Sequence, residues 1–320
     1  MVQNFLIGIL VIVIAIWFLG PREPVDLTVS FSEQDLGDDL DGYLAESEAR
    51  VADLAPEHAK SIQWAGEVGV KTDFSIVYIH GFSATKEEIR PVPDDVAAAL
   101  GANLFYTRLT GHGRNGAAMA QTTVNDWLND AAEALAIGRR LGDRVIVISS
   151  STGGTILTLL SLDRDQVDRV AGAILMSPNF GIQASGRQLL TMPFARQLVP
   201  LITGETRSWE PQSEAQRKHW ATSYPSVALL PMAAAVQMAN ESSVEQIIFP
   251  ALFMISPDDQ VVSPEATRAI AKRWSGATTM WEIGGAEVGD ASAHVLAGDI
   301  VSPATNKKVT DAMIAWIRDL

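Results

Sequence analysis

The stretch VIVISSSTGG, residues 145–154, decides how the rest of the chain is interpreted. Four β-branched apolar residues run directly into three serines, a threonine and two glycines. A continuous apolar run of this kind is typical of a strand buried on both faces of a parallel sheet. The polar end has three possible meanings: a helix N-cap, a phosphate-binding loop, or the setting of a nucleophile. No lysine follows Gly154, as a P-loop requires, so phosphate binding is disfavoured.

Similar apolar runs recur along the chain and alternate with helical patterns. The strand-like runs are residues 74–79, 103–108, 144–149, 172–177, 250–255 and 279–283. The helical patterns cover residues 86–100, 125–141, 154–162, 264–274 and 306–319. This alternation predicts an α/β fold, in which helices flank a mostly parallel sheet and connect its strands by right-handed crossovers.

One long gap in this alternation indicates an inserted segment. Residues 181–246 contain no convincing strand, and an insertion of this size is more easily explained as a helical cap than as a structureless loop. We therefore predict an α/β core formed by residues 61–180 and 247–320, with residues 181–246 as the cap. Residues 21–60 are acidic and weakly patterned, and we interpret them as a linker with a short helix over residues 41–54.

The N-terminal end is the most apolar part of the chain. Residues 5–20 read FLIGILVIVIAIWFLG and hold no charge, but they fall slightly short of the ~20 residues that comfortably cross a bilayer. A cleaved signal peptide is disfavoured, because no lysine or arginine precedes the run and no small-x-small cleavage site follows it. A buried helix is the third alternative. We predict that residues 1–20 form an uncleaved transmembrane helix and that the protein is a single-pass membrane protein of undetermined orientation.

Composition excludes several classes of function. The chain has 320 residues, of which 24 are basic and 38 acidic, so its formal net charge is −14. This negative field repels nucleic acids and anionic lipid headgroups, so we expect no nucleic-acid partner. The absence of cysteine excludes disulfides, thiolate chemistry and cysteine-based zinc sites. No His-Glu-x-x-His motif or carboxylate cluster indicates a metal site, and we expect neither a metal nor another cofactor.

Polar residues follow the ends of several predicted strands. In open α/β sheets, ligands bind outside the carboxyl ends of the strands, so these residues are candidates for a site. A hydroxyl, a carboxylate and an imidazole occur there in the chain order Ser, Asp, His. The candidates are His80, Gly81 and Phe82 after the first run, Ser150 and Ser151 after the third, Asp258 and Asp259 after the fifth, and His294 after the last.

These features resemble the α/β-hydrolase family over residues 60–320, and most closely its capped carboxylesterases and monoacylglycerol-lipase-like serine hydrolases. The family places its nucleophile in Gly-x-Ser-x-Gly, a sharp turn between a strand and a helix. The matching residues 149–153 read SSSTG, with serine at position 149 where the family has glycine. The resemblance therefore implies that Ser151 is the nucleophile.

The resemblance also implies the partners of the nucleophile. The family's Gly-x-x-Asp segment matches residues 256–259, SPDD, again with serine in place of glycine. This match selects Asp259, rather than the neighbouring Asp258, as the catalytic acid. The segment SAHVLAGD resembles the family's Ser-x-His-Val and implies that His294 is the general base.

By the same resemblance, the backbone N–H groups of Phe82 and Thr152 would form the oxyanion hole, and Gly81 and Phe82 would contact the substrate. Such preorganised donors are worth about 2.7–4 kcal/mol each to the transition state. Glycine at position 81 allows the chain to approach the substrate closely. Of the remaining histidines, His80 and His112 are expected to be scaffold residues. His58 and His219 are expected to lie at the surface.

We predict a serine hydrolase that cleaves esters of carboxylic acids through an acyl-enzyme. Apolar residues in 181–246 favour a small-molecule ester with an apolar, lipid-like acyl chain. A thioesterase and an aminopeptidase remain open, because both use the same three residues; Glu205, Glu210 or Glu214 could hold the amine of a peptide. An inactive binding or scaffold protein on the same fold also remains open, and only the serines at positions 149 and 256 support it. The oligomeric state is left open.

Overall fold

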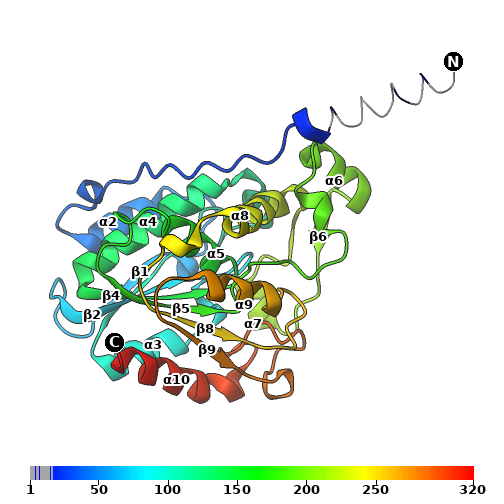
Figure 1. The fold of residues 1–320 in the computed structure, drawn as a ribbon. Coiled ribbons are helices and arrows are strands. Elements are labelled where there is room, and N and C mark those ends of the chain that lie inside the picture. Colours follow the sequence, from blue (N-terminus) through cyan, green and yellow to red (C-terminus); the bar gives the residue numbers. More distant parts are fainter. Residues whose placement is uncertain (1–3, 5–6, 8–14, 16) are drawn as a thin grey trace.

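A computed structural model describes residues 4, 7, 15 and 17–320, and Figure 1 shows its fold. Within these residues, seven strands form one sheet in the order β1-β3-β2-β4-β5-β8-β9. Every neighbouring pair is parallel except β1 and β3. The strands are β1 (Ser61–Gln63), β2 (Thr72–Ile79), β3 (Asn103–Tyr106), β4 (Gly142–Ser150), β5 (Val170–Met176), β8 (Ala251–Ile255) and β9 (Thr278–Glu282).

Helices cover both faces of this sheet (Figure 1). Two of them pack together on one face, and the others build the apolar core on the opposite face. The first group is α3 (Val92–Leu100) and α10 (Asn306–Arg318), and the second is α4 (Val124–Leu141), α5 (Thr152–Leu160), α8 (Leu229–Glu241) and α9 (Pro264–Arg273). Strand β2 shows why the sheet is apolar throughout: Val77 and Ile79 join the α4 side, whereas Ile76 and Tyr78 join the α10 side.

The predicted α/β fold with a mostly parallel sheet is confirmed. All six predicted strands and all five predicted helices overlap elements of the structure. Strand β1 was not predicted, because its three residues SIQ are too few and too polar to give a strand pattern. This strand lies at the edge of the sheet and pairs with β3, with Ser61 opposite Tyr106.

The N-terminal segment 21–60 is packed along the α/β core. Its helix α2 (Leu40–Ala49) is shorter than the expected helix over residues 41–54. Leu36, Leu40 and Leu44 are at most 6% exposed and join the core on the α4 side. The segment therefore differs from the linker that its acidic composition suggested, because Leu40 and Leu44 share one face of α2 and are buried together with Leu36 from the preceding turn.

A buried ion pair fastens this segment to the core. The side chains of Glu48 and Arg108 are only 8% and 6% exposed. Arg108 donates from Nε and Nη2 to the two carboxylate oxygens of Glu48, each at 2.8 Å, and the Lys60 N–H donates to Glu48 Oε2 at 2.9 Å. Two parallel hydrogen bonds between charged groups make this a strong contact. Removing one partner leaves the other charge buried and uncompensated.

Glu48→Ala is accordingly expected to lower the free energy of unfolding by about 3–5 kcal/mol, which urea denaturation would measure. Glu46→Ala on the same helix is the control. The Glu46 side chain is 80% exposed and lies 3.8 Å from Arg50, so its loss should leave the unfolding midpoint where it is in the wild type. Equal midpoints for the two variants would contradict a structural role for the buried pair.

The predicted transmembrane helix of residues 1–20 is corrected by the structure. Among the residues that it describes, no helix is both long and apolar enough to cross a membrane. A crossing needs about 20 predominantly apolar residues, and the uncharged run 5–20 is shorter than that. Much of the predicted anchor, namely residues 1–3, 5–6, 8–14 and 16, lies outside the described residues. On this finding, the prediction of a single-pass membrane protein is wrong.

The inserted segment 181–246 is mainly helical but also contains strands. It holds α6 (Ala195–Thr203), α7 (Glu214–His219), α8, and an antiparallel ribbon of β6 (Thr206–Ser208) and β7 (Ser223–Pro225). Strands of three residues are too short to show an alternating pattern, so the sequence did not reveal them. Helix α8 packs on α5 within the main core, whereas α6 and β6 lie at the right-hand edge of the molecule in Figure 1.

Candidate active site

Ser151 stands in a sharp turn between the end of β4 and the start of α5. Its backbone has φ 48° and ψ −116°, which a residue with a Cβ rarely adopts. Gly153 makes the turn possible, because a Cβ there would lie 2.3 Å from the Ile79 carbonyl oxygen. The start of α5 can therefore approach β2 closely, and the turn holds Ser151 at the carboxyl end of the sheet.

Position 149, where the resemblance expects glycine, accommodates serine. Ser149 is fully buried, and its hydroxyl donates a hydrogen bond to the Ile174 carbonyl oxygen of β5 at 3.2 Å. The facing residue on α5 is Gly154, where a Cβ would come within 2.9 Å of Pro178. The additional hydroxyl is therefore hydrogen-bonded, and the close packing at this turn is carried by the glycines that follow it.

The structure brings Ser151, His294 and Asp259 into one hydrogen-bonded chain. His294 Nε2 lies 3.0 Å from Ser151 Oγ, and His294 Nδ1 lies 2.8 Å from Asp259 Oδ2. An ionised carboxylate only accepts, so Nδ1 carries the proton and Nε2 is free to accept the serine proton. The other Asp259 oxygen accepts the N–H groups of Val261 and Val262 at 2.7 and 2.9 Å. These are the contacts by which an imidazole activates a serine nucleophile.

Asp258, the other candidate acid, is not part of the Ser151-His294-Asp259 hydrogen bonds. Its Oδ2 accepts a hydrogen bond from the Gly285 N–H at 2.7 Å, in the loop after β9. The side chains of the two neighbouring aspartates therefore diverge in the turn that follows β8. Of the two, Asp259 is the one in contact with His294.

The loop that carries His294 is held by Asp290, a residue that the sequence analysis missed. Asp290 Oδ2 accepts the N–H groups of His294 and Val295 at 3.0 and 2.9 Å and the Ser292 hydroxyl at 2.6 Å. Ser177 donates its hydroxyl to the His294 carbonyl oxygen at 2.7 Å. An aspartate that binds the N–H two residues later is a local turn signal, so the sequence did indicate a turn here.

The pKa of His294 is raised above its ordinary value of 6.5. Burial of the ring lowers the pKa, but the negative charge of Asp259 and the hydrogen bond to it outweigh the burial. The charges of Glu88 and Asp290 raise the pKa further. The site therefore stabilises the imidazolium, which is the state that forms when His294 takes the serine proton.

Activity is consequently expected to fall on the acid side of a midpoint that lies above pH 6.5. Below this midpoint His294 is protonated and cannot accept the Ser151 proton, whereas above it the imidazole is neutral and competent. The measurement is kcat/KM for an uncharged substrate as a function of pH, because that ratio reports the groups of the free enzyme. A profile that stays flat well below pH 6.5 would contradict the assignment.

The two predicted oxyanion donors, Phe82 and Thr152, both line a cavity beside Ser151. Thr152 is the first residue of α5, where a backbone N–H has no partner within the helix. The Phe82 N–H donates no hydrogen bond within the described residues. Gly81, which was expected to contact substrate, does not line the cavity in the described structure. Its N–H instead donates to Glu88 Oε2 at 2.8 Å.

His80 lies under the loop that carries Phe82. Its Nε2 accepts the Leu109 N–H at 3.0 Å, so its proton sits on Nδ1, which donates to the Gly81 carbonyl oxygen at 2.8 Å. Burial, the largest cause, lowers the pKa of His80 well below its usual range and keeps the ring neutral. His112 packs beside it, with ring centroids 5.0 Å apart.

His58 differs from its expected surface position. It is 6% exposed, and its Nε2 lies 3.0 Å from Nδ1 of His219 on α7. The expectation is wrong because the segment 21–60 folds onto the core, where His58 is covered by Gly113 and His219. Neither histidine lines the cavity in the described structure.

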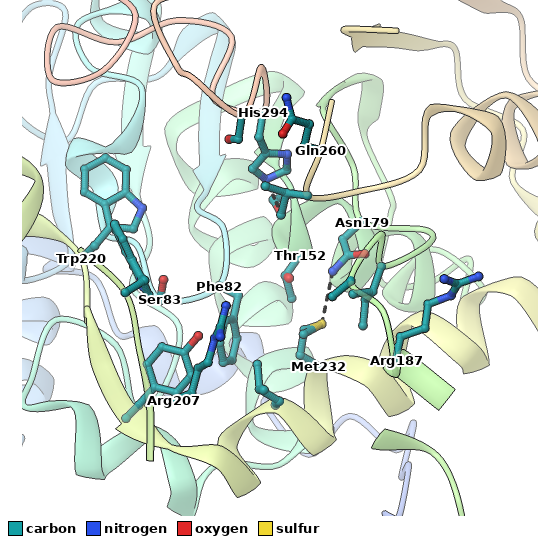
Figure 2. Close-up of a pocket in the computed structure, with 18 of the residues that line it drawn as sticks. Phe82, Ser83, Thr152, Asn179, Arg187, Arg207, Trp220, Met232, Gln260 and His294 are labelled. Carbon is teal, nitrogen blue, oxygen red and sulfur yellow. Dashed lines mark hydrogen bonds between the residues drawn. The ribbon is translucent and has the colours of Figure 1, made fainter. Parts of the chain in front are cut away.

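A cavity of about 680 Å³ is lined by Ser151 and His294. Figure 2 shows His294 and Gln260 at one end of it, Phe82 and Trp220 along one side, and Met232 at the other end. The apolar part of the wall includes Leu189, Leu190, Val199, Trp209, Trp220, Leu229 and Met232. Within the described residues, no group of His, Asp or Glu side chains is arranged to hold a metal ion.

A mostly parallel sheet, a serine in a strand-to-helix turn and a Ser-His-Asp hydrogen-bond chain define an α/β-hydrolase of the serine type. Residues 71–282 match the family described as serine aminopeptidase, S33, and the chain belongs to this family. The matched region begins just before β2 and ends with β9. It therefore includes Ser151 and Asp259 and stops before His294.

Individual relatives are similar to the chain at low identity. A thermostable monoacylglycerol lipase from Bacillus sp. (strain H-257) is 24% identical over 189 residues, which are 59% of this chain and 72% of the relative. A structure from work on the metagenome-derived lipolytic enzymes LipS and LipT has a TM-score of 0.64 at 18% identity and covers 83% of this chain and 100% of its own. A monoacylglycerol lipase from Paleococcus ferrophilus has a TM-score of 0.59 at 14% identity and covers 81% and 97%. The structural likeness shows a shared fold.

Proposed function

We propose that the protein is a serine hydrolase that cleaves esters of carboxylic acids through an acyl-enzyme. The observation that carries this proposal is the hydrogen-bonded chain from Asp259 through His294 to Ser151, which ends at the wall of a cavity. Membership of a serine hydrolase family and similarity to lipolytic enzymes support ester hydrolysis as the reaction.

In the proposed reaction, Ser151 Oγ attacks the acyl carbon while His294 Nε2 takes the hydroxyl proton. Asp259 stabilises the imidazolium, and the tetrahedral oxyanion would accept hydrogen bonds from the N–H groups of Phe82 and Thr152. Collapse of this intermediate breaks the ester bond, and the departing alcohol receives the proton from His294. Water then attacks the acyl-enzyme by the same route and releases the carboxylic acid. These steps use groups of the chain and no cofactor.

The proposed substrate is a small ester with an apolar, lipid-like acyl chain. A cavity of about 680 Å³ falls within the size range of pockets that bind small molecules. Leu189, Trp209 and Met232 of the segment 181–246 line its wall, and burial of each CH₂ group of an acyl chain contributes about 0.8 kcal/mol. We therefore propose that this segment acts as a cap that sets the preferred chain length.

An aminopeptidase with the same three residues is the main competing function, because the family carries that description. Such an enzyme needs an acidic group that holds the substrate ammonium. Of Glu205, Glu210 and Glu214, Glu210 alone lines the cavity in the described structure. Its side chain is 94% exposed, so a contact with a substrate ammonium there would be screened by water and weak. The ester remains the favoured substrate.

The test is the hydrolysis of p-nitrophenyl esters from acetate to palmitate by the full-length protein, beside matched thioesters and an aminoacyl p-nitroanilide. We expect turnover of the esters, with a maximum at one chain length, and covalent labelling of Ser151 by a fluorophosphonate. Turnover of the anilide without the esters would identify an aminopeptidase. Absence of both turnover and labelling would leave an inactive binding protein and reject the proposal.

A further inference from the structure

Glu88 is a buried carboxyl beside the proposed active site that the mechanism above does not use. It ends the short helix Lys86–Glu88 between β2 and α3, and it is 3% exposed. Its Oε2 accepts two hydrogen bonds at 2.8 Å, one from the Gly81 N–H and one from the Tyr78 hydroxyl. Glu88 itself lines the cavity that Ser151 and His294 also line.

This carboxyl has no ion-pair partner in the described part of the chain. Its basic neighbours are bound elsewhere: Lys86 donates to the Ser61 hydroxyl, and Arg90 pairs with Glu87 and Asp94. His294, whose charge lowers the pKa of Glu88, is hydrogen-bonded to Asp259 and Ser151. Burial of a carboxyl group without a cation is costly. Burial is the largest influence on Glu88 and raises its pKa, although the hydrogen bonds from Gly81 and Tyr78 lower it. Such an arrangement is more typical of a working site than of a stabilising core contact.

Glu88 holds the peptide that precedes the one with a proposed oxyanion donor, so that Gly81 is fixed on both sides. Glu88 holds the N–H of Gly81, while the Gly81 carbonyl oxygen accepts from His80 Nδ1 at 2.8 Å and from the Ala84 N–H at 3.3 Å. In a trans peptide the C=O and the following N–H point in opposite directions. Fixing Gly81 on both sides therefore fixes the direction of the Phe82 N–H.

Glycine at position 81 permits this arrangement. A Cβ there would lie 2.8 Å from Glu88 Oε1 and 3.1 Å from Ser151 Cβ. The Glu88 carboxyl, the loop and the nucleophile thus meet at one point, with no space for a side chain on the residue between them. A small displacement of Gly81 would move the Phe82 N–H relative to the acyl carbon bound at Ser151.

We propose that Glu88 is a positioning residue of the active site, which holds Gly81 so that the Phe82 N–H is aimed at the developing oxyanion. The inference rests on the proposed ester hydrolysis and adds a residue that neither the motif nor the triad contains. Removal of one oxyanion donor typically lowers kcat about 10²–10³-fold, so misdirecting the Phe82 N–H should have an effect at the lower end of that range.

Two conservative variants separate the effect of the length of the Glu88 side chain from the effect of its negative charge. Glu88→Gln keeps the length of the side chain, and its amide oxygen can accept from both Gly81 and Tyr78. Glu88→Asp keeps the carboxyl but withdraws it from Gly81 by one methylene. A positioning role predicts that kcat for the preferred ester falls about 10²-fold in Glu88→Asp, with KM little changed, and stays within about tenfold of the wild type in Glu88→Gln.

A second readout distinguishes positioning from a general effect on folding. A trifluoromethyl ketone with the same acyl chain forms a tetrahedral adduct that carries an oxyanion, so its inhibition constant should rise in Glu88→Asp by the same factor as kcat/KM falls. The matched control is Glu133→Asp. Glu133 is another buried glutamate, and it accepts a hydrogen bond from the Tyr43 hydroxyl at 2.7 Å but does not line the cavity in the described structure. Its kcat should equal that of the wild type.

Three results would overturn the inference. The first is a kcat equal to that of the wild type in a folded Glu88→Asp variant. The second is a fall in kcat in a folded Glu88→Gln variant as large as the fall expected for Glu88→Asp. The third is an inhibition constant of the ketone that does not change in parallel with kcat/KM. The Gln variant is nearly isosteric, so it remains measurable if the Asp variant does not fold, and a large loss of kcat in it would by itself overturn the inference. A wild-type protein without any ester hydrolysis would instead reject the proposed function, which keeps the two failures distinct.

Discussion

Replacing Ser151 with alanine is expected to lower kcat for the preferred ester by about 10⁶-fold. Ser151 Oγ is the protein atom that bonds to the acyl carbon in the proposed reaction, and without it no acyl-enzyme forms and His294 Nε2, 3.0 Å away, has no nucleophile of the protein to activate. The loss should appear in kcat, because an alanine leaves the cavity wall and the oxyanion donors in place. The measurements are steady-state ester hydrolysis and fluorophosphonate labelling. Turnover should fall by the stated factor, and labelling should disappear.

The control for this variant is Ser161→Ala. Ser161 is a buried serine at the far end of α5, and its hydroxyl donates to the Leu157 carbonyl oxygen at 2.7 Å. It shares the helix and the burial of the nucleophile but not its proximity to His294, so its kcat should match the wild type. Residual activity above about 1% of wild type in Ser151→Ala would show that another group acts as nucleophile.

Asp259→Asn is expected to lower kcat about 10⁴-fold while the protein remains folded. The asparagine amide can donate to His294 Nδ1, which would move the ring proton to Nε2. That nitrogen could then no longer accept the Ser151 proton, although the distances of 2.8 and 3.0 Å would be nearly unchanged. The variant therefore separates the chemical role of the carboxylate from its role in packing.

Asp258→Asn is the matched control, since it makes the same chemical change one residue earlier. Asp258 binds the Gly285 N–H at 2.7 Å and does not contact His294, so we expect kcat close to that of the wild type. A loss in Asp258→Asn as large as that in Asp259→Asn would mean that the loop, and not the carboxylate at His294, is what both substitutions disturb.

Much of the fold could be predicted because burial leaves a local pattern. Residues 145–148 are apolar at every position, and in the structure these residues of β4 join cores on both faces of the sheet. That pattern needs no knowledge of the neighbouring strands. The elements that escaped prediction are the short ones: β1, β6 and β7 have three residues each, too few for any period to show.

Composition proved a poor guide at the N-terminal end. The acidic residues of 21–60 suggested a linker, yet Leu36, Leu40 and Leu44 are buried and Glu48 binds Arg108 inside the protein. An acidic composition indicates that much of a segment faces water. It does not exclude that a few leucines, here three, are buried and attach the segment to the core. The expected membrane anchor was likewise inferred from composition, and within the described residues no helix meets the requirements of a membrane crossing.

The sequence by itself determined the α/β architecture, the position of the turn at Ser151 and the strand ends at which a site could form. These are local properties, set by apolar runs and by small residues at tight turns. The resemblance had already selected Asp259 over Asp258, and the structure places that carboxylate at His294. Only the tertiary structure revealed that Asp290 holds the histidine loop and that Glu88 lies against Gly81. Asp259 and His294 are 35 residues apart, so their distance follows from the path of the chain between them, which no local pattern records. The contacts of Asp290 with His294 and of Glu88 with Gly81 join residues close in the chain, but they depend on how the loops that carry them fold.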